Sequence, residues 1–241
     1  MAVSHIIESC PDFLRESIGV NDRTPLHLAA NVGPAIGEAM LRLGAEVDID
    51  NPGYSPIFEA AREGPRSTVA MLLHHGANAN YVSTGGTTPL FWTATSRRTD
   101  RKQVVDLLCR HGAIWNLHSS LYMEEDCISR KLLSEGPTSL TKSPFSSGVL
   151  TTAVLTNRPL DIVRAILSYG ANPNGDPSGV PPLVGLLGHA DCNLEMVRLL
   201  LDNGADPNAR SAAGNTPLLH HKSSFSNPAV IELLTCYGAH E

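Results

Sequence analysis

The chain has 241 residues, of which 42% are hydrophobic, so it is long enough to bury a sizeable core. Its net charge of −6 argues against a general nucleic-acid binder, because such proteins carry a basic face. Its five widely spaced cysteines include no Cys-x-x-Cys pair, which argues against a disulfide framework or a zinc site and favours an intracellular protein, cytoplasmic or nuclear.

The amino-terminal region carries no recognisable export or membrane signal. The chain lacks an apolar run long enough to span a bilayer, and Met-Ala-Val-Ser-His lacks the basic and apolar regions of a signal peptide. We therefore expect a soluble protein without a membrane partner. In residues 1–19, Ile6, Phe13 and Leu14 follow helical spacing and Pro11 suits a first helical position, which predicts a capping segment.

The first clear element begins at Thr24-Pro25-Leu26-His27. Thr24 can accept a hydrogen bond at a helix start, and Pro25 suits the first helical position. An apolar stripe later in this copy ends at Gly44, where a glycine can take the left-handed conformation that closes a helix. The two landmarks together predict a pair of helices.

Both landmarks recur along the chain. Further helix starts lie at Ser55-Pro56, Thr88-Pro89, Gly148-Val149, Pro181-Pro182 and Thr216-Pro217, and further closing glycines are Gly76, Gly112, Gly170, Gly204 and Gly238. From Gly44 onward the glycines are 32, 36, 58, 34 and 34 residues apart, and all but one step lie near the roughly 33-residue period of a turn plus two helices. The pattern resembles the ankyrin repeat family. This resemblance implies an all-α, ankyrin-type helix-turn-helix solenoid with short hairpin-like turns over residues 20–241, expected as a monomer.

The 58-residue step predicts an insertion at about residues 117–147, because it fits neither one repeat nor two. Within it, the spacing of apolar residues predicts a helix from Leu121 to Glu135, followed by a mobile loop over 136–144. A long excursion of this kind is either functional or disordered, and the sequence leaves both open. Ser143-Pro144 in this loop is a candidate phosphorylation site.

Several polar residues have a structural explanation. Asn80, Asn116, Asn174 and Asn208 share one column of the repeat turns, where asparagine bonds its own backbone. The resemblance also leaves hydroxylation of this asparagine open. It further implies that His27 bridges neighbouring turns through hydrogen bonds.

A search for chemistry finds no metalloprotease, nucleophile-elbow, phosphate-loop or dinucleotide motif. His189, Cys192, His220 and His221 could be considered for zinc, but His220 and His221 are adjacent and point about 100° apart on a helix. We therefore predict no catalytic residue, no metal and no cofactor. The alternative is a small-molecule binder or unusual enzyme with a pocket between the groove and the insertion.

The favoured function is a non-catalytic adaptor or interaction module that binds a still unidentified partner protein. The resemblance implies that turn tips and the exposed ends of inner helices contact the partner, whereas Trp92, aligned with Leu28, is expected in the core. Trp115, at the edge of the insertion, is expected to contact the partner or to anchor the insertion. The candidate partner-binding residues are Arg23, Asn31, Tyr54, Arg62, Glu63, Arg97, Arg98, Trp115, His189 and Asn215.

Overall fold

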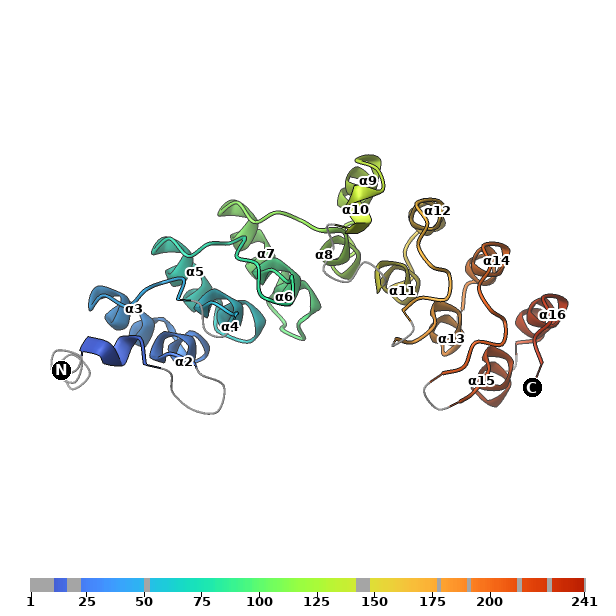
Figure 1. Cartoon of the computed structure of the whole chain (residues 1–241), viewed down its shortest axis with the longest axis horizontal. Coiled ribbons are helices and arrows are strands. Elements are labelled where there is room, and N and C mark those ends of the chain that lie inside the picture. The colour runs from blue at the N-terminus through green and yellow to red at the C-terminus, as the bar shows by residue number, and fades with distance from the viewer. Residues whose placement is uncertain are drawn as a thin grey trace. The chain divides into compact units, whose positions relative to one another are not determined.

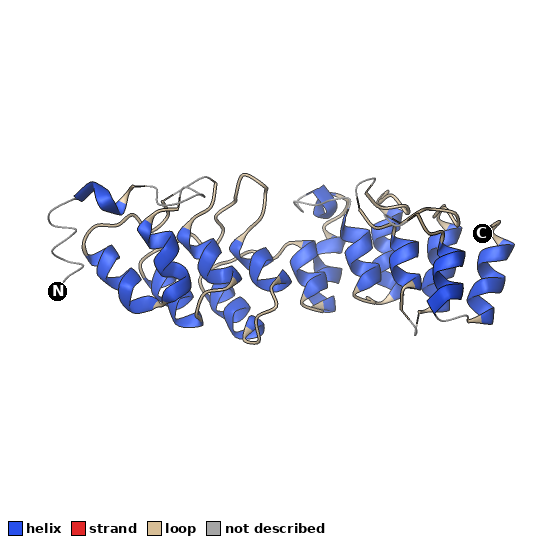
Figure 2. Cartoon of the chain, turned by 90° about the horizontal axis from the view of Figure 1, so that it is seen from below, coloured by secondary structure: helices blue, strands red, loops and turns tan. Residues whose placement is uncertain are grey.

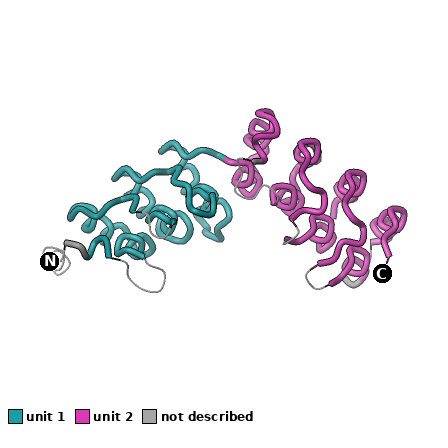
Figure 3. The backbone as a smooth tube through the Cα atoms, viewed as in Figure 1, with its two compact units in different colours: residues 1–115 teal, residues 116–241 magenta. Residues whose placement is uncertain are grey.

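The computed structural model describes residues 11–16, 23–49, 53–141, 148–176, 179–189, 192–211, 214–224 and 227–240. These residues belong to two compact units, residues 1–115 and residues 116–241 (Figure 3). In the described ranges the regular elements are helices, and no β-strand occurs (Figure 2). The all-α prediction is therefore confirmed.

Unit 1, residues 1–115, is a stack of three helix pairs (Figure 1). The inner helices α2, α4 and α6 pack on one another in order, and the outer helices α3, α5 and α7 do the same. Pro25, Pro56 and Pro89 each occupy the first position of an inner helix, as predicted. The elements are η1 (Pro11–Leu14), α2 (Pro25–Val32), α3 (Pro34–Arg42), α4 (Pro56–Arg62), α5 (Arg66–His74), α6 (Pro89–Thr95) and α7 (Arg101–Arg110).

Unit 2, residues 116–241, repeats this arrangement with α8 packed on α11, α9 on α12, α11 on α13, α13 on α15 and α14 on α16. Its core is continuous from Leu117 through Ile162 and Leu183 to Leu234, all of them buried. Its elements are α8 (Leu117–Tyr122), α9 (Asp126–Ser134), α10 (Thr138–Thr141), α11 (Gly148–Leu155), α12 (Leu160–Ser168), α13 (Pro182–Leu187), α14 (Leu194–Asp202), α15 (Pro217–Ser224) and α16 (Pro228–Cys236).

The segment predicted as an insertion contains a helix pair. The expected single helix from Leu121 to Glu135 is wrong, because the structure has α8 and α9 there, with Leu117 and Leu133 in the core of unit 2. Gly136 has φ 93°, like the repeat-closing glycines, and lies 34 residues before Gly170. We therefore interpret residues 113–136 as a shortened copy of the repeat, whereas the boundaries given from sequence remain predictions.

The ends of this segment also differ from expectation. Part of the predicted loop over 136–144 is helical in α10, and Ser143-Pro144 lies outside the described residues. Asn116 replaces the usual Thr-Pro start, and its side chain caps α8 by accepting a hydrogen bond from Ser119 N at 2.8 Å. This different start explains why the copy was missed. At the amino terminus, Leu14 is buried in the core of unit 1, and the capping role of residues 1–19 stays a prediction.

Thr24 does not cap α2 as predicted. Its hydroxyl lies 2.8 Å from His27 Nδ1, and His27 Nε2 lies 2.8 Å from the carbonyl oxygen of Tyr54 in the next copy. Thr24 and His27 are both buried. The bridging role expected for His27 is confirmed, and Thr24 orients the ring that forms the bridge.

The asparagine column links each repeat to the next. Asn80 Oδ1 accepts a hydrogen bond from Ile114 N at 2.8 Å, and Asn80 Nδ2 donates one to Gly112 O at 2.7 Å. Asn174 and Asn208 make the same pair of bonds to the following closing turns. The predicted structural role is confirmed for these three, although their side chains bond the following repeat, whereas the fourth member of the predicted column, Asn116, caps α8. The first copy differs, because Asp48 occupies the column and its two carboxylate oxygens accept from Asn78 N at 3.1 and 2.9 Å.

Replacing Asp48 by asparagine is expected to stabilise unit 1 by about 1 kcal/mol. Burial, with repulsion from Glu46 as a further cause, raises the pKa of Asp48, and a carboxylate cannot donate to the carbonyl of the closing turn. An amide would restore the two-way bond of the later copies. Urea unfolding followed by tryptophan fluorescence measures the change, since Trp92 and Trp115 are the only tryptophans and both lie in unit 1. A lower midpoint for the variant would contradict this account.

The free energy of unfolding of unit 2 is expected to decrease as the pH is lowered, because His118 is buried in its neutral form. This side chain is 3% exposed, and burial lowers its pKa to about 4. Between an unfolded pKa of about 6.5 and the folded value, the unfolded chain binds a proton that the folded chain excludes, so stability falls by up to about 3 kcal/mol as the pH falls through this window. Urea unfolding followed by circular dichroism at several pH values should show this slope. His118→Gln should remove it, whereas His111→Gln, at an exposed position, should not.

Candidate protein-binding surface

The exposed positions of the inner helices of unit 1 form one stripe. Leu28 on α2, Glu59 on α4 and Trp92 on α6 occupy the same repeat column, with Arg62 and Thr95 one turn further along their helices. Leu28 is 39% exposed, and Trp92 is half-buried rather than part of the core. The prediction that Trp92 is a core residue is therefore wrong, because the column that it shares with Leu28 faces outward.

Trp92 lines a cleft of about 390 Å³ at the carboxyl ends of α4 and α6. Its Nε1 donates a hydrogen bond to Thr87 Oγ1 at 3.0 Å, and the Arg62 guanidinium lies 5.4 Å from its ring centroid. This distance is typical of a cation–π contact. We call this feature the Trp92 cleft, lined by Arg62, Glu63, Trp92, Thr95, Ser96, Arg97 and Arg98.

The three arginines of the cleft have different roles. Arg62 is half-exposed and forms an ion pair with Glu63 at 3.0 Å. Arg97 is exposed and forms no ion pair with any described residue. Arg98, by contrast, is 9% exposed and donates to Ala60 O, Ala61 O and Gly64 O at 2.9 to 3.0 Å. The sequence predicted both Arg97 and Arg98 as contact residues, but Arg98 closes the carboxyl end of α4 and pairs with Asp100.

Other predicted contact residues of unit 1 lie on either side of the cleft. Arg23 forms an ion pair with Glu59 at 2.7 Å, and Asn31 Nδ2 donates to the same carboxylate at 3.3 Å. Tyr54 is exposed and its ring meets Phe58 edge to face. These residues continue the exposed stripe from α4 towards α2.

The contacts of Trp115 lie within unit 1, so its two predicted roles, contact with a partner or anchoring of the insertion, stay predictions. Trp115 packs against the core of unit 1, as Cys109 does. Burial raises the pKa of the Cys109 thiol, with Asp106 as a second cause. Trp115 therefore stabilises the end of unit 1, and we leave it out of the proposed contact surface.

His189 and Asn215 belong to unit 2, so the structure does not place them beside the Trp92 cleft. His189 is exposed. Asn215 O accepts a hydrogen bond from Ser211 N at 3.0 Å, and Asn215 N donates one to Ser211 Oγ at 3.2 Å. His221 is fully buried, where its Nδ1 lies 3.3 Å from Leu187 O and its Nε2 accepts from Asn227 N at 3.2 Å. The histidines that motivated a ligand pocket are therefore divided between packing and surface positions.

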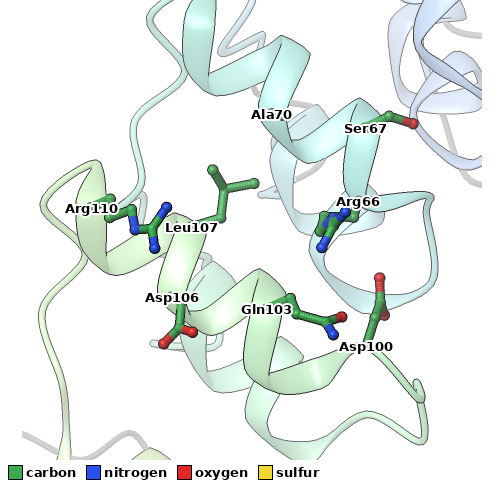
Figure 4. Close-up of a pocket in the computed structure, with 8 residues that line it drawn as sticks. All are labelled: Arg66, Ser67, Ala70, Asp100, Gln103, Asp106, Leu107 and Arg110. Atoms are coloured by element: carbon green, nitrogen blue, oxygen red, sulfur yellow. The ribbon is translucent and has the colours of Figure 1, made fainter.

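Larger hollows lie between outer helices. One of about 860 Å³ separates α5 from α7, with Arg66 and Arg110 alternating with Asp100 and Asp106 along its walls (Figure 4). A similar hollow of about 450 Å³ lies between α12 and α14 in unit 2. Because the same groove recurs between consecutive outer helices, we attribute it to helix spacing. It lacks the aromatic centre that distinguishes the Trp92 cleft.

The described residues contain no group of three His, Cys, Asp or Glu side chains arranged to hold a metal ion. None of the helices in the described part of the chain combines the length and the apolar character that a transmembrane span needs.

Comparisons with known proteins agree with the repeat pattern. Residues 2–83 match the family model "Ankyrin repeats (3 copies)", and residues 188–235 match "Ankyrin repeats (many copies)". The chain is 29% identical over 234 residues to human ankyrin repeat and MYND domain-containing protein 1, a match that covers 83% of this chain and 24% of that protein. It is 30% identical over 200 residues to ankyrin repeat and KH domain-containing protein mask-1 of Caenorhabditis elegans, covering 80% of this chain and 8% of that protein.

The chain thus spans about a quarter of one curated relative and under a tenth of the other. Among solved structures, the crystal structure of the human ASB11 ankyrin repeat domain is similar, with a TM-score of 0.48 and 23% identity, covering 91% of this chain and all of that one. The repeat register, the stacked helix pairs of both units and the two family-model matches show that the chain belongs to the ankyrin repeat family.

Proposed function

We propose that this chain is an adaptor that binds a partner protein through the inner-helix stripe of unit 1, centred on the Trp92 cleft. Ankyrin repeats are protein–protein interaction modules, and the cleft supplies a specific place for such contact. The observation that carries the proposal is a half-buried tryptophan whose Nε1 donates to Thr87 and whose ring centroid lies 5.4 Å from the Arg62 guanidinium, in the column that it shares with the exposed Leu28.

The energetics of interfaces support this choice. Tryptophan and arginine are the residue types most enriched at binding hot spots, where a partner excludes water from around them. Trp92 is fixed at its Nε1 edge, so less side-chain entropy is lost when a partner covers the ring. The stripe continues through Tyr54 and Asn31, which gives a partner contacts on all three inner helices of unit 1.

Site-specific photo-crosslinking tests this proposal. A photoreactive side chain at Thr95, in the cleft, should form a discrete adduct with a protein in an extract of the source cells. The same side chain at Arg42, on the outer helix α3 and 74% exposed, serves as the matched control and should not form that adduct. Equal adducts from both positions, or adducts from Arg42 alone, would contradict binding through the stripe.

A further inference from the structure

Positive charge is concentrated at one edge of unit 1. The turns that connect α4 to α5 and α6 to α7, with the residues next to them, carry six cationic residues and only two acidic ones in a chain of net charge −6. The cationic residues are Arg62, Arg66, Arg97, Arg98, Arg101 and Lys102, and the acidic ones are Glu63 and Asp100. This edge includes the Trp92 cleft.

Internal contacts occupy some of these cations and leave others to face solvent. Arg98 is bound to Asp100 and to three carbonyl groups, and Arg101 Nη1 donates to Ala94 O at 3.3 Å. Arg62 is exposed and pairs with Glu63, with its Nε 3.0 Å from Glu63 Oε1, and Arg97 forms no ion pair with the described residues. Of the three arginines that line the cleft, Arg62 and Arg97 are therefore exposed, and the Arg62 guanidinium lies 5.4 Å from the ring centroid of Trp92.

Resting on the function proposed above, we propose that the occupant of the Trp92 cleft is an acidic peptide segment of the partner. Carboxylates of this segment bind Arg62 and Arg97, and an adjacent apolar side chain packs on Trp92. Arginine forms bidentate hydrogen bonds with carboxylates, and these are among the stronger polar contacts available to an exposed site.

The charge distribution favours a short segment over a long polyanion. At physiological salt, charges interact over roughly 8 Å, so a short peptide in the cleft experiences the local excess of positive charge. A nucleic acid or an anionic membrane would extend beyond it, over a chain whose remaining residues are strongly acidic. Glu63 lies close to Arg62 and is negatively charged. It therefore repels a phosphate, whose charge is concentrated on one group, more than it repels carboxylates that are spaced along a peptide.

Fluorescence anisotropy with defined peptides and the full chain tests this inference. The probe is a fluorescein-labelled peptide of about 12 residues, long enough to span one repeat. It is rich in Asp and Glu and has one central Phe. Matched peptides replace the acids by Asn and Gln, or by Lys. The acidic peptide should bind, the amide peptide should bind at least about tenfold more weakly, and high salt should weaken the acidic complex.

Charge reversal supplies the sharpest variant. The double variant Arg62→Glu, Arg97→Glu should bind the acidic peptide more than about tenfold more weakly and should bind the lysine peptide, because the charge of the cleft is reversed. Both side chains are exposed, so the variant should keep its fold. Arg42→Glu, on an exposed position of α3, should leave acidic-peptide binding unchanged. Trp92→Leu introduces the residue type that Leu28 provides at this column in the first repeat. It should weaken the binding of all the peptides to a similar extent.

Different results would contradict the acidic-segment inference and the proposed function. Equal binding of acidic and amide peptides, no binding of either, or an unchanged double variant would overturn the acidic-segment inference, while a specific adduct at position 95 would still support partner binding. Tighter binding of a single-stranded oligonucleotide than of the acidic peptide would also overturn it. The loss of the position-95 adduct itself would instead remove the proposed function.

Discussion

Replacing Arg98 by methionine is expected to lower the free energy of unfolding of unit 1 by about 2–5 kcal/mol, because each carbonyl group left without its donor costs about 1–3 kcal/mol. The Arg98 guanidinium is almost fully buried and donates to three carbonyl groups at the end of α4. Methionine fills similar space but donates nothing, so Ala60 O and Gly64 O lose this donor, whereas Ala61 O keeps the hydrogen bond from Thr93 Oγ1 at 3.2 Å. Because Asp100 is one-third exposed, solvent screens part of its ion pair, and the carbonyl contacts account for most of the loss.

Arg97→Met is the matched control for this prediction. Arg97 is the neighbouring residue and is exposed, so its replacement should change the stability by less than about 0.5 kcal/mol. Urea unfolding followed by tryptophan fluorescence reports unit 1 for both variants. The Asp100 pKa offers a second readout, since the hydrogen bond from Arg98 is the main cause of its lowered value and Arg98→Met should raise it. Equal stability of the two variants would show that Arg98 is not a structural residue.

Replacing Leu72 by alanine is expected to cost about 2–5 kcal/mol, the range for a large buried aliphatic side chain. Leu72 on the outer helix α5 is fully buried, which confirms the helix face predicted from the sequence. Leu199→Ala, on α14 in unit 2, should cost a similar amount because Leu199 is also buried. Such a loss is a large fraction of the stability of a typical domain.

The two leucine variants should differ in how they are detected. Leu72→Ala should shift the transition seen by tryptophan fluorescence, whereas Leu199→Ala should shift circular dichroism more, because both tryptophans lie in unit 1. Val82→Ala, at a position that is 61% exposed, serves as the control and should be nearly neutral. A near-neutral Leu72→Ala would mean that the outer helices do not bury this face.

The repeat pattern predicted most of the helix pairs because its landmarks have local physical causes. Proline at the first helical position and a glycine with positive φ at the closing turn, as at Gly76 and Gly204, act within a few residues. The pattern did not predict the shortened copy at residues 113–136, because Asn116 starts it in place of a Thr-Pro pair. A capping asparagine is a weaker signal, since asparagine is also common in turns.

The candidate site was less predictable, because its residues are distinguished by tertiary contacts. Arg97 and Arg98 are adjacent residues of the same type. Arg98 is buried because it contacts the carboxyl end of α4, whereas Arg97 faces solvent, and the sequence does not distinguish the two. Trp92 was expected in the core because it aligns with Leu28, but Leu28 itself is exposed, so the alignment places Trp92 on an outward-facing column. Arg62 and Tyr54, predicted as contact residues, do lie on the exposed stripe.

Partner retention by matched variants tests the central claim most directly. The intact chain, Arg62→Ala with Trp92→Ala, and the control Arg42→Ala with Val82→Ala would be immobilised and exposed to an extract of the source cells, and retained proteins quantified by mass spectrometry. We predict that a protein held by the intact chain and by the control falls at least about tenfold with the cleft variant, since each lost hot-spot contact is worth 1 kcal/mol or more. Undiminished retention by a folded cleft variant would contradict binding through the Trp92 cleft.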